Sequence, residues 1–249
     1  MTRQWEKARA RSAVYEYLSA AFLYPSEDTL AILRNNGKVV SYLMDWLYGE
    51  ESGAHLLSFV EALSTWTLEE AQEEFTDAFG HIVSTDCPPY EGEYGQAHVF
   101  LKSQSLADLA AFYSAFGLEI DPDLKDRMDH ISVELEFMHI LTMKEVHTLR
   151  GRLGRRKVQL CRQAQSSFLK EHLGYWACSF AGRLATMSEG RLYGSLAMAL
   201  DLFVKGEAVS FDLPVGPEQP IIPEPRIDED PDCFACPLAV NSDLEVSLP

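Results

Sequence analysis

The chain has no long apolar run. Its 249 residues contain no stretch that approaches the roughly 18 consecutive apolar residues of a membrane span, so stable membrane insertion is not expected. The first residues, Met1 to Lys7, lack the apolar core of a secretory signal peptide. The cysteine count is five, an odd number, which favours reduced thiols over a disulfide framework. These features together predict a cytoplasmic protein.

Basic residues are missing from a long internal segment. Between Val39 and Leu101 there is no lysine or arginine, whereas there are twelve carboxylates. The whole chain has a net charge of −17, and residues 207–249 supply −9 of it through ten acids and one arginine. A surface of this kind attracts cations or basic peptides and repels nucleic acid and anionic membranes. Nucleic acid is therefore not expected as a partner.

The patterns of common enzyme classes are also missing. No glycine-rich phosphate loop is present, and no Ser-His-Asp order stands out. Glu136 and His139 have the Glu-x-x-His spacing of half a di-iron site, but no second pair of this kind occurs. The sequence therefore predicts a protein that is not an enzyme.

Apolar residues recur at three- or four-residue steps through almost all of the first 206 residues, without the alternation typical of strands. The predicted fold class is all-α, a single domain of about ten helices over residues 1–206. Asn35-Asn36-Gly37 predicts the end of one short helix, with another beginning at Val39. Thr67 and Glu70 have the spacing of a capping box and predict a helix that runs to Phe79.

Residues 207–249 have a different character. Eight of the twelve prolines lie there, together with the ten acids. Such a composition buries too little apolar surface to offset its ordering entropy. An extended, acidic, proline-rich C-terminal arm is predicted.

Asp129, His130 and Glu134 form the first candidate site. Asp129 is expected to begin a long helix, in which His130 and Glu134 share a face one turn apart. The two carboxylates could bind a guanidinium, which pairs with them in two-point fashion, while His130 hydrogen-bonds beside it. The alternative is that Asp129 caps the helix and His130 only contacts Glu134.

The second candidate is the loop Pro88-Pro89-Tyr90-Glu91-Gly92-Glu93-Tyr94-Gly95. Its prolines restrict the backbone, its glycines permit turns, and its tyrosines offer flat apolar faces with a polar tip. This combination suits the clamping of an extended peptide by Tyr90, Glu91 and Tyr94. The alternative is an ordinary connection between helices.

Cys233 and Cys236 form the C-x-x-C pair of the arm. Two thiolates at this spacing can hold zinc or an iron–sulfur cluster if two more ligands complete the site, and Cys87 and Cys161 are the candidates. The alternative is a pair of reduced thiols without a metal.

The helical layout, the Pro-Pro-Tyr-Glu-x-x-Tyr-Gly loop and Asp129-His130-x-x-x-Glu134-Leu135 resemble the TorD/DmsD/NarJ family of redox-enzyme maturation chaperones, from about Tyr15 to Val204. The resemblance implies a TorD-like fold and a cytoplasmic chaperone for one molybdopterin oxidoreductase of the dimethyl sulfoxide reductase superfamily. Its partners would be the catalytic subunit and that subunit's N-terminal leader, often of twin-arginine type. The protein would hold the apoenzyme for cofactor insertion before export or assembly.

The family's leader-binding positions correspond here to Asp129, His130 and Glu134, and less closely to Tyr90, Glu91 and Tyr94. Two other functions stay open. One is a cysteine-ligated metal or iron–sulfur protein with a redox or cluster-delivery role. The other is an adaptor whose acidic arm docks a basic partner. A monomer and a domain-swapped dimer are equally compatible with the sequence.

Overall fold

The computed structural model describes residues 2–80, 87–94, 99–119 and 127–214, and within these ranges the fold is all-helical, as predicted. The C-terminal arm from residue 215, with Cys233 and Cys236, lies outside the described residues. None of the described helices combines the length and the apolarity that crossing a membrane requires.

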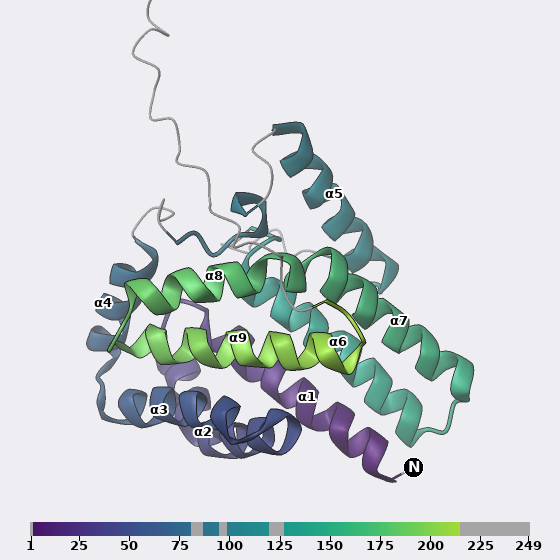
Figure 1. The fold of residues 1–249 in the computed structure, drawn as a ribbon, viewed down its shortest axis with the longest axis horizontal. Helices are drawn as coiled ribbons and strands as arrows, with labels where there is room; N and C mark the ends of the chain where they lie inside the picture. The colour runs from purple at the N-terminus through teal and green to yellow at the C-terminus, as the bar shows by residue number, and fades with distance from the viewer. Residues whose placement is uncertain (1, 81–86, 95–98, 120–126, 215–249) are drawn as a thin grey trace, which may run out of the picture.

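Nine α-helices and one short 3-10 helix make up the described fold. In chain order they are α1 (Thr2–Ala21), α2 (Glu27–Tyr48), α3 (Glu50–Thr65), α4 (Leu68–Phe79), η1 (Glu91–Glu93), α5 (Val99–Ala115), α6 (Ile131–Arg150), α7 (Arg155–Glu171), α8 (Leu173–Met187) and α9 (Leu192–Ser210). Three close pairs organise the bundle: α1 with α6, α2 with α3, and α8 with α9. Figure 1 shows α9 running across the middle of the bundle, with α8 on one side and α2 and α3 on the other.

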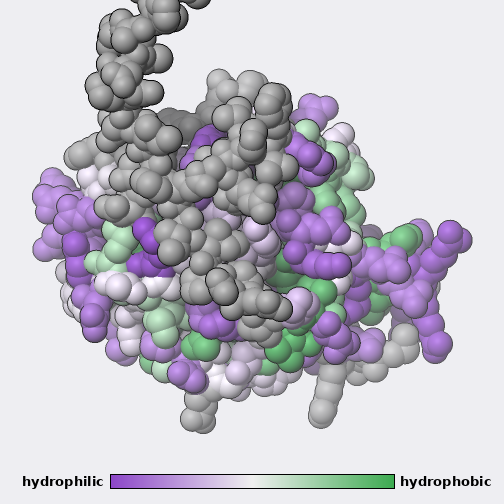
Figure 2. All heavy atoms as spheres, turned by 45° about the horizontal axis from the view of Figure 1, so that its top comes forward, coloured by the Kyte–Doolittle hydropathy of each residue, from purple (hydrophilic) through white to green (hydrophobic). Residues whose placement is uncertain are grey.

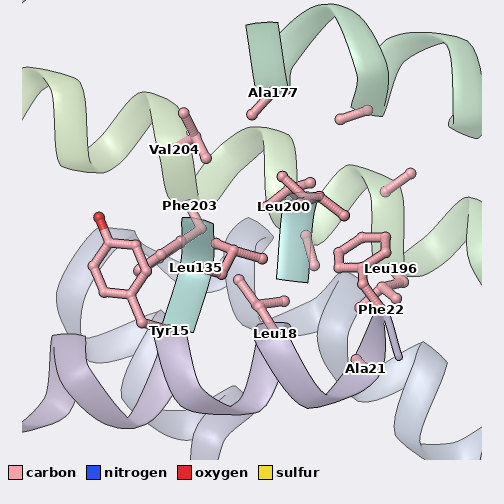
Figure 3. Packing of buried hydrophobic residues seen from close by; sticks show 14 of the residues in the cluster. Tyr15, Leu18, Ala21, Phe22, Leu135, Ala177, Leu196, Leu200, Phe203 and Val204 are labelled. Carbon is pink, nitrogen blue, oxygen red and sulfur yellow. The ribbon is translucent and has the colours of Figure 1, made fainter. Parts of the chain in front are cut away.

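The core lies where α1, α6, α8 and α9 meet. Figure 3 shows the side chains that fill it, namely Tyr15, Leu18, Ala21 and Phe22 of α1, Leu135 of α6, Ala177 of α8, and Leu196, Leu200, Phe203 and Val204 of α9. The rings of Tyr15 and Phe203 meet edge to face with their centroids 4.7 Å apart. Burial of each large apolar side chain contributes about 1.5–3 kcal/mol, so this cluster stabilises the packing of α9 in the bundle.

The predicted break at Asn35-Asn36-Gly37 is wrong, because α2 continues through it to Tyr48. Gly37 is buried where α2 approaches α3 and α1 closely. A Cβ at this position would lie 2.7 Å from a methyl carbon of Val60 and 2.8 Å from the hydroxyl of Tyr17. The glycine thus permits close packing in mid-helix and does not end the helix.

The helical body also extends past the boundary expected at residue 206. Helix α9 runs to Ser210, and Glu207 is completely buried. Arg11 of α1 holds the Glu207 carboxylate through its Nε at 2.6 Å, and the Tyr15 hydroxyl donates to the same carboxylate at 2.7 Å. An acidic residue that composition assigns to the arm is therefore part of the core.

The capping box at the start of α4 is present as predicted. The backbone N–H of Thr67 donates to the Glu70 carboxylate at 2.6 Å, and the N–H of Glu70 donates to the Thr67 hydroxyl at 3.2 Å. Each bond satisfies a donor that the first helical turn leaves unpaired.

Candidate functional site

The proline–tyrosine loop docks on the start of α6. The N–H of Glu91 donates to the carbonyl of Asp129, and the N–H of Ile131 donates to the carbonyl of Pro89, both at 2.9 Å. These two bonds place Tyr90 opposite His130 in an isolated antiparallel bridge. The two stretches that the sequence predicts as separate candidate sites therefore form one structure.

Asp129 lies before α6, not within it. The helix begins at Ile131, so the expectation that Asp129 opens the helix is wrong. The Asp129 side chain is 1% exposed and receives a guanidinium from its own chain. Arg127 donates from Nε to Oδ1 at 2.9 Å and from Nη2 to Oδ2 at 2.6 Å, and the N–H of Gly92 donates to Oδ2 at 3.1 Å.

His130 is the N-cap of α6. Its Nδ1 accepts from the N–H of Ser132 at 3.2 Å and lies 2.6 Å from the hydroxyl oxygen of the same serine. The imidazole meets the Tyr90 ring edge to face, with the ring centroids 5.2 Å apart. The buried histidine thus joins the helix start to the loop and packs against the ring of Tyr90.

Glu134 is fully buried, one turn into α6. The indole N–H of Trp176 donates to both carboxylate oxygens, at 3.2 and 3.1 Å. Burial, and then the negative charge of nearby Glu91, raise the pKa of Glu134 well above its ordinary value, against the smaller opposing effect of the Trp176 hydrogen bond. In this position Glu134 holds α8 against α6.

Glu91 connects the loop to an open groove. Its carboxylate accepts from the Ser105 hydroxyl at 2.9 Å and lies 3.2 Å from Nδ1 of His172. Ser105 and His172 also line a groove of about 570 Å³ between α5 and the junction of α7 and α8. We call it the acidic groove; its lining is completed by Gln104, Asp108, Ala111, Phe112 and Glu171.

Tyr94 is buried in the core beneath the loop. Its ring packs against Trp176 and Phe180 at centroid distances of 5.2 and 6.2 Å, and its hydroxyl lies 3.9 Å from the Cys87 sulfur. Burial raises the pKa of the Tyr94 hydroxyl, which therefore stays neutral. Tyr94 and Cys87 anchor the two ends of the described loop.

The sequence analysis did not name three residues that complete this site, Arg127, His172 and Trp176, and it included Glu93 only as part of the loop. Among the three, only Arg127 is close in sequence to a predicted site residue, since it stands two residues before Asp129. His172 lies 81 residues from Glu91, and Trp176 lies 42 residues from Glu134, the carboxylates that they contact. Only the packing of α8 against α6 and the loop brings them there.

A second groove, of about 540 Å³, lies between α6 and α7, and we call it the basic groove. Its lining is mostly apolar, with Lys144 and Lys157 among the residues that surround it. The exposed side chains of Met143 and Leu160 belong to it. Lysines in this position make it a poor receptor for a cationic ligand.

The zinc or iron–sulfur site predicted at the cysteines finds no support in the described residues. They contain no group of three or more histidine, cysteine or acidic side chains that could hold a metal ion. The buried Cys87 thiol donates to the carbonyl of Phe180 at 3.8 Å, and the half-buried Cys161 lies beside Thr148 of α6. Nδ1 of His139 lies 3.0 Å from both the hydroxyl and the carbonyl oxygen of Ser12, which gives it a structural role.

Comparison with known proteins gives a consistent result. The chain is 25% identical over 211 residues to a chaperone protein TorD of Vibrio cholerae, covering 81% of this chain and 92% of the relative. It is 28% identical over 174 residues to a perchlorate reductase assembly chaperone of Dechloromonas aromatica, covering 69% and 76% of the two chains. It is also 28% identical over 194 residues to a chlorate reductase assembly chaperone of Ideonella dechloratans, covering 76% and 84%.

All three relatives are named as chaperones and none as an enzyme, in agreement with the sequence analysis. The family model described as nitrate reductase delta subunit matches residues 48–182, a range that contains the loop, the start of α6 and most of α8. Because this match spans more than half of the chain, the protein belongs to the nitrate reductase delta subunit family, the TorD/NarJ type of redox-enzyme maturation proteins.

Proposed function

We propose that this protein is a cytoplasmic chaperone that binds the catalytic subunit of a molybdopterin oxidoreductase and holds it in the apo form until its cofactor is inserted. The observation that carries this proposal is the similarity, over 81% of the chain and nearly all of the relative, to a protein named as a chaperone. We further propose that the contact is made with the subunit's arginine-bearing N-terminal leader.

The acidic groove supports the second part of the proposal. Asp108 and Glu171 are exposed along it, and the carboxylate of Glu91 lies beneath Ser105 and His172. Phe112 adds an apolar surface in the same groove. A leader joins arginines to an apolar stretch, so its receptor needs carboxylates beside apolar side chains. Figure 2 shows hydrophilic and hydrophobic areas side by side on one face of the described surface.

The charges of the two grooves separate them as candidates. Asp108 and Glu171 border the acidic groove, whereas Lys144 and Lys157 border the basic groove. An arginine-bearing peptide is attracted to the first and repelled by the second, and charge complementarity of this kind sets the rate and specificity of association. The acidic groove is therefore the better receptor.

Titration calorimetry of the full chain with the N-terminal leader of a molybdopterin oxidoreductase from the same genome tests this proposal. We expect binding that weakens as salt rises, and much weaker binding of a matched leader in which lysines replace the arginines. No binding of either leader, together with a fully active reductase in cells that lack this protein, would contradict the proposal.

A pair of substitutions locates the contact. Asp108→Asn with Glu171→Gln should weaken leader binding by about two- to fivefold for each lost carboxylate, as expected for exposed ion pairs. Glu69→Gln with Glu73→Gln removes two exposed carboxylates from α4 and serves as the control, for which no change is expected. Equal effects of both pairs would indicate general attraction to an acidic protein and no defined groove.

The arm-based adaptor is the competing proposal, and the fold determines how to test it. Removal of residues from 207 onward would delete the buried Glu207 and unfold the core. The truncation must therefore begin after Pro214. If loss of residues 215–249 abolishes leader binding and the groove substitutions do not, the adaptor is correct.

A further inference from the structure

The guanidinium of Arg127 lies in a receptor built from three side chains. Two of its nitrogens donate to the two oxygens of Asp129 at 2.9 and 2.6 Å, and the third donates to Glu93 at 3.1 Å. Its central carbon lies 4.6 Å from the centroid of the Tyr90 ring. Two-point pairing with a carboxylate, a second carboxylate and an aromatic face are the elements that recognise an alkylguanidinium. We call Asp129, Glu93 and Tyr90 the arginine site.

The receptor and its occupant differ in how firmly the fold holds them. The side chains of Asp129 and Glu93 are 1% and 16% exposed, whereas that of Arg127 is 40% exposed. The N–H of Gly92 fixes Asp129 from the loop side, and the bridge between Tyr90 and His130 fixes the aromatic face. The receptor is thus part of the packed loop, while its occupant reaches it from the solvent side.

We propose that the arginine site is the receptor for an arginine of the client leader, and that Arg127 occupies it in cis until the leader displaces it. This inference rests on the proposed function, since it names how that function recognises its ligand. Exchange of the Arg127 guanidinium for that of the leader keeps the buried Asp129 paired both before and after the leader binds. A permanently empty site would instead leave a buried carboxylate without its cation, which is strongly destabilising.

Occupation of the arginine site by the protein's own Arg127 has a measurable consequence. A ligand that binds only when Arg127 has left has its apparent affinity reduced by the fraction of molecules that are open. If Arg127 fills the site about nine-tenths of the time, its removal should tighten binding by roughly tenfold. A purely structural Arg127 predicts the opposite, because its loss would loosen the loop and weaken binding.

The test uses the full chain with Arg127→Ala and two small probes, N-acetyl-arginine amide and N-acetyl-lysine amide. The variant should melt at a lower temperature than the wild type, and millimolar arginine amide should restore the lost stability in a saturable way. The lysine amide should not, since an ammonium cannot pair with Asp129 at two points. The double variant Arg127→Ala, Asp129→Asn should lose the response to the arginine amide.

Leader binding is measured on the same proteins. Arg127→Ala should bind the arginine leader about tenfold more tightly than the wild type. Arg191→Ala is the matched control, because Arg191 is 43% exposed and also pairs with two carboxylates, those of Glu74 and Asp77, while no aromatic ring of the described residues stacks on its guanidinium. Its leader affinity should equal that of the wild type.

The wild type gives an independent readout should Arg127→Ala fail to fold. Saturation with leader should release the Arg127 side chain, so that its Nε–H signal in ¹⁵N NMR moves towards the position of a free arginine and exchanges faster with water. An unchanged signal at saturation would overturn the inference.

The two proposals fail in different ways. If the arginine amide rescues Arg127→Ala but no leader binds any variant, the arginine site stands and the leader-binding function falls. If the leader binds the wild type and Arg127→Ala equally well and the amide rescues nothing, the leader-binding function stands and this inference falls.

Discussion

The buried pair of Arg11 and Glu207 offers the sharpest test of how the fold is held together. Both side chains are almost completely buried, at 2% and 0% exposure, and they join the first helix to the last. Arg11 also donates to Glu145 at 3.2 Å and to Gln165 at 2.9 Å. Although burial alone would raise the pKa of Glu207, the Arg11 guanidinium and the tyrosine hydroxyls hold it below its ordinary value.

Arg11→Met keeps the volume of the side chain and removes its charge. Two carboxylates, those of Glu207 and Glu145, then remain in the core without their shared cation, and breaking a buried pair in this way costs about 3–5 kcal/mol. At about 2–4 °C per kcal/mol for a chain of this size, the melting temperature should fall by roughly 6–20 °C. Scanning calorimetry and urea unfolding measure the two quantities.

Arg162→Met is the matched control. Arg162 donates to the same Glu145 at 3.4 Å and lies over the same Phe211 ring that Arg11 contacts, but its side chain is 40% exposed. An exposed pair contributes about 0–1 kcal/mol, so this variant should melt within a few degrees of the wild type. If Arg11→Met costs no more than Arg162→Met, the buried network of Arg11, Glu207 and Glu145 does not stabilise the fold.

The pH dependence has a defined sign. Because the pKa of Glu207 is lowered in the folded state, its contribution to stability is present at neutral pH and is lost as the pH falls through that lowered pKa. In Arg11→Met the buried Glu207 carboxylate lacks its cation and is relieved of its charge by taking up a proton. The difference in stability between wild type and variant should therefore shrink in acid. A difference that grows in acid would contradict the assignment.

Two further substitutions test local features of the fold. Glu134→Gln keeps an acceptor for Trp176 and removes a carboxyl group whose pKa is raised in the folded protein. The stability of this variant relative to the wild type should therefore increase as the pH rises above the ordinary glutamate range. Thermal melts over a pH series measure this difference, and a difference that stays constant with pH would refute the prediction. Gly37→Ala should cost about 1–3 kcal/mol in urea unfolding, because its Cβ meets Val60 and Tyr17, whereas Gly182→Ala, with nothing within 4 Å, should be neutral or gain up to about 1 kcal/mol.

The parts of the fold that were predictable depend on neighbours in sequence. The capping box of Thr67 and Glu70 spans three residues, and the helical periodicity spans four, so both can be read without knowledge of the fold. Gly37 shows the limit of such reasoning. A glycine that ends a helix and a glycine that admits a neighbouring helix look the same in one sequence, and only the position of Val60 distinguishes them.

The prediction that Glu207 belongs to the arm was wrong for the same reason, with a larger separation in sequence between the contacting residues. Composition placed it in the acidic arm because the residues that follow it are acidic and rich in proline. Its partner Arg11 lies 196 residues away, and no local pattern reports that contact. A single acid can therefore belong to the core even though the segment that follows it is acidic and rich in proline.

The candidate site contains both features that the sequence predicted and features that it did not. The sequence selected residues of the loop and of the start of α6 by their chemistry, and the structure brings them together, because the same carboxylates, rings and turns that suit a ligand also bind one another. Their accessibility could not be predicted. Glu134 and Tyr94 are fully buried, whereas Arg127, which no prediction included, is the exposed occupant of the arginine site. Glu134 is enclosed where α8 packs against α6 and forms part of the frame of the site, whereas the proposed exchange of guanidinium groups would take place at the exposed side chain of Arg127.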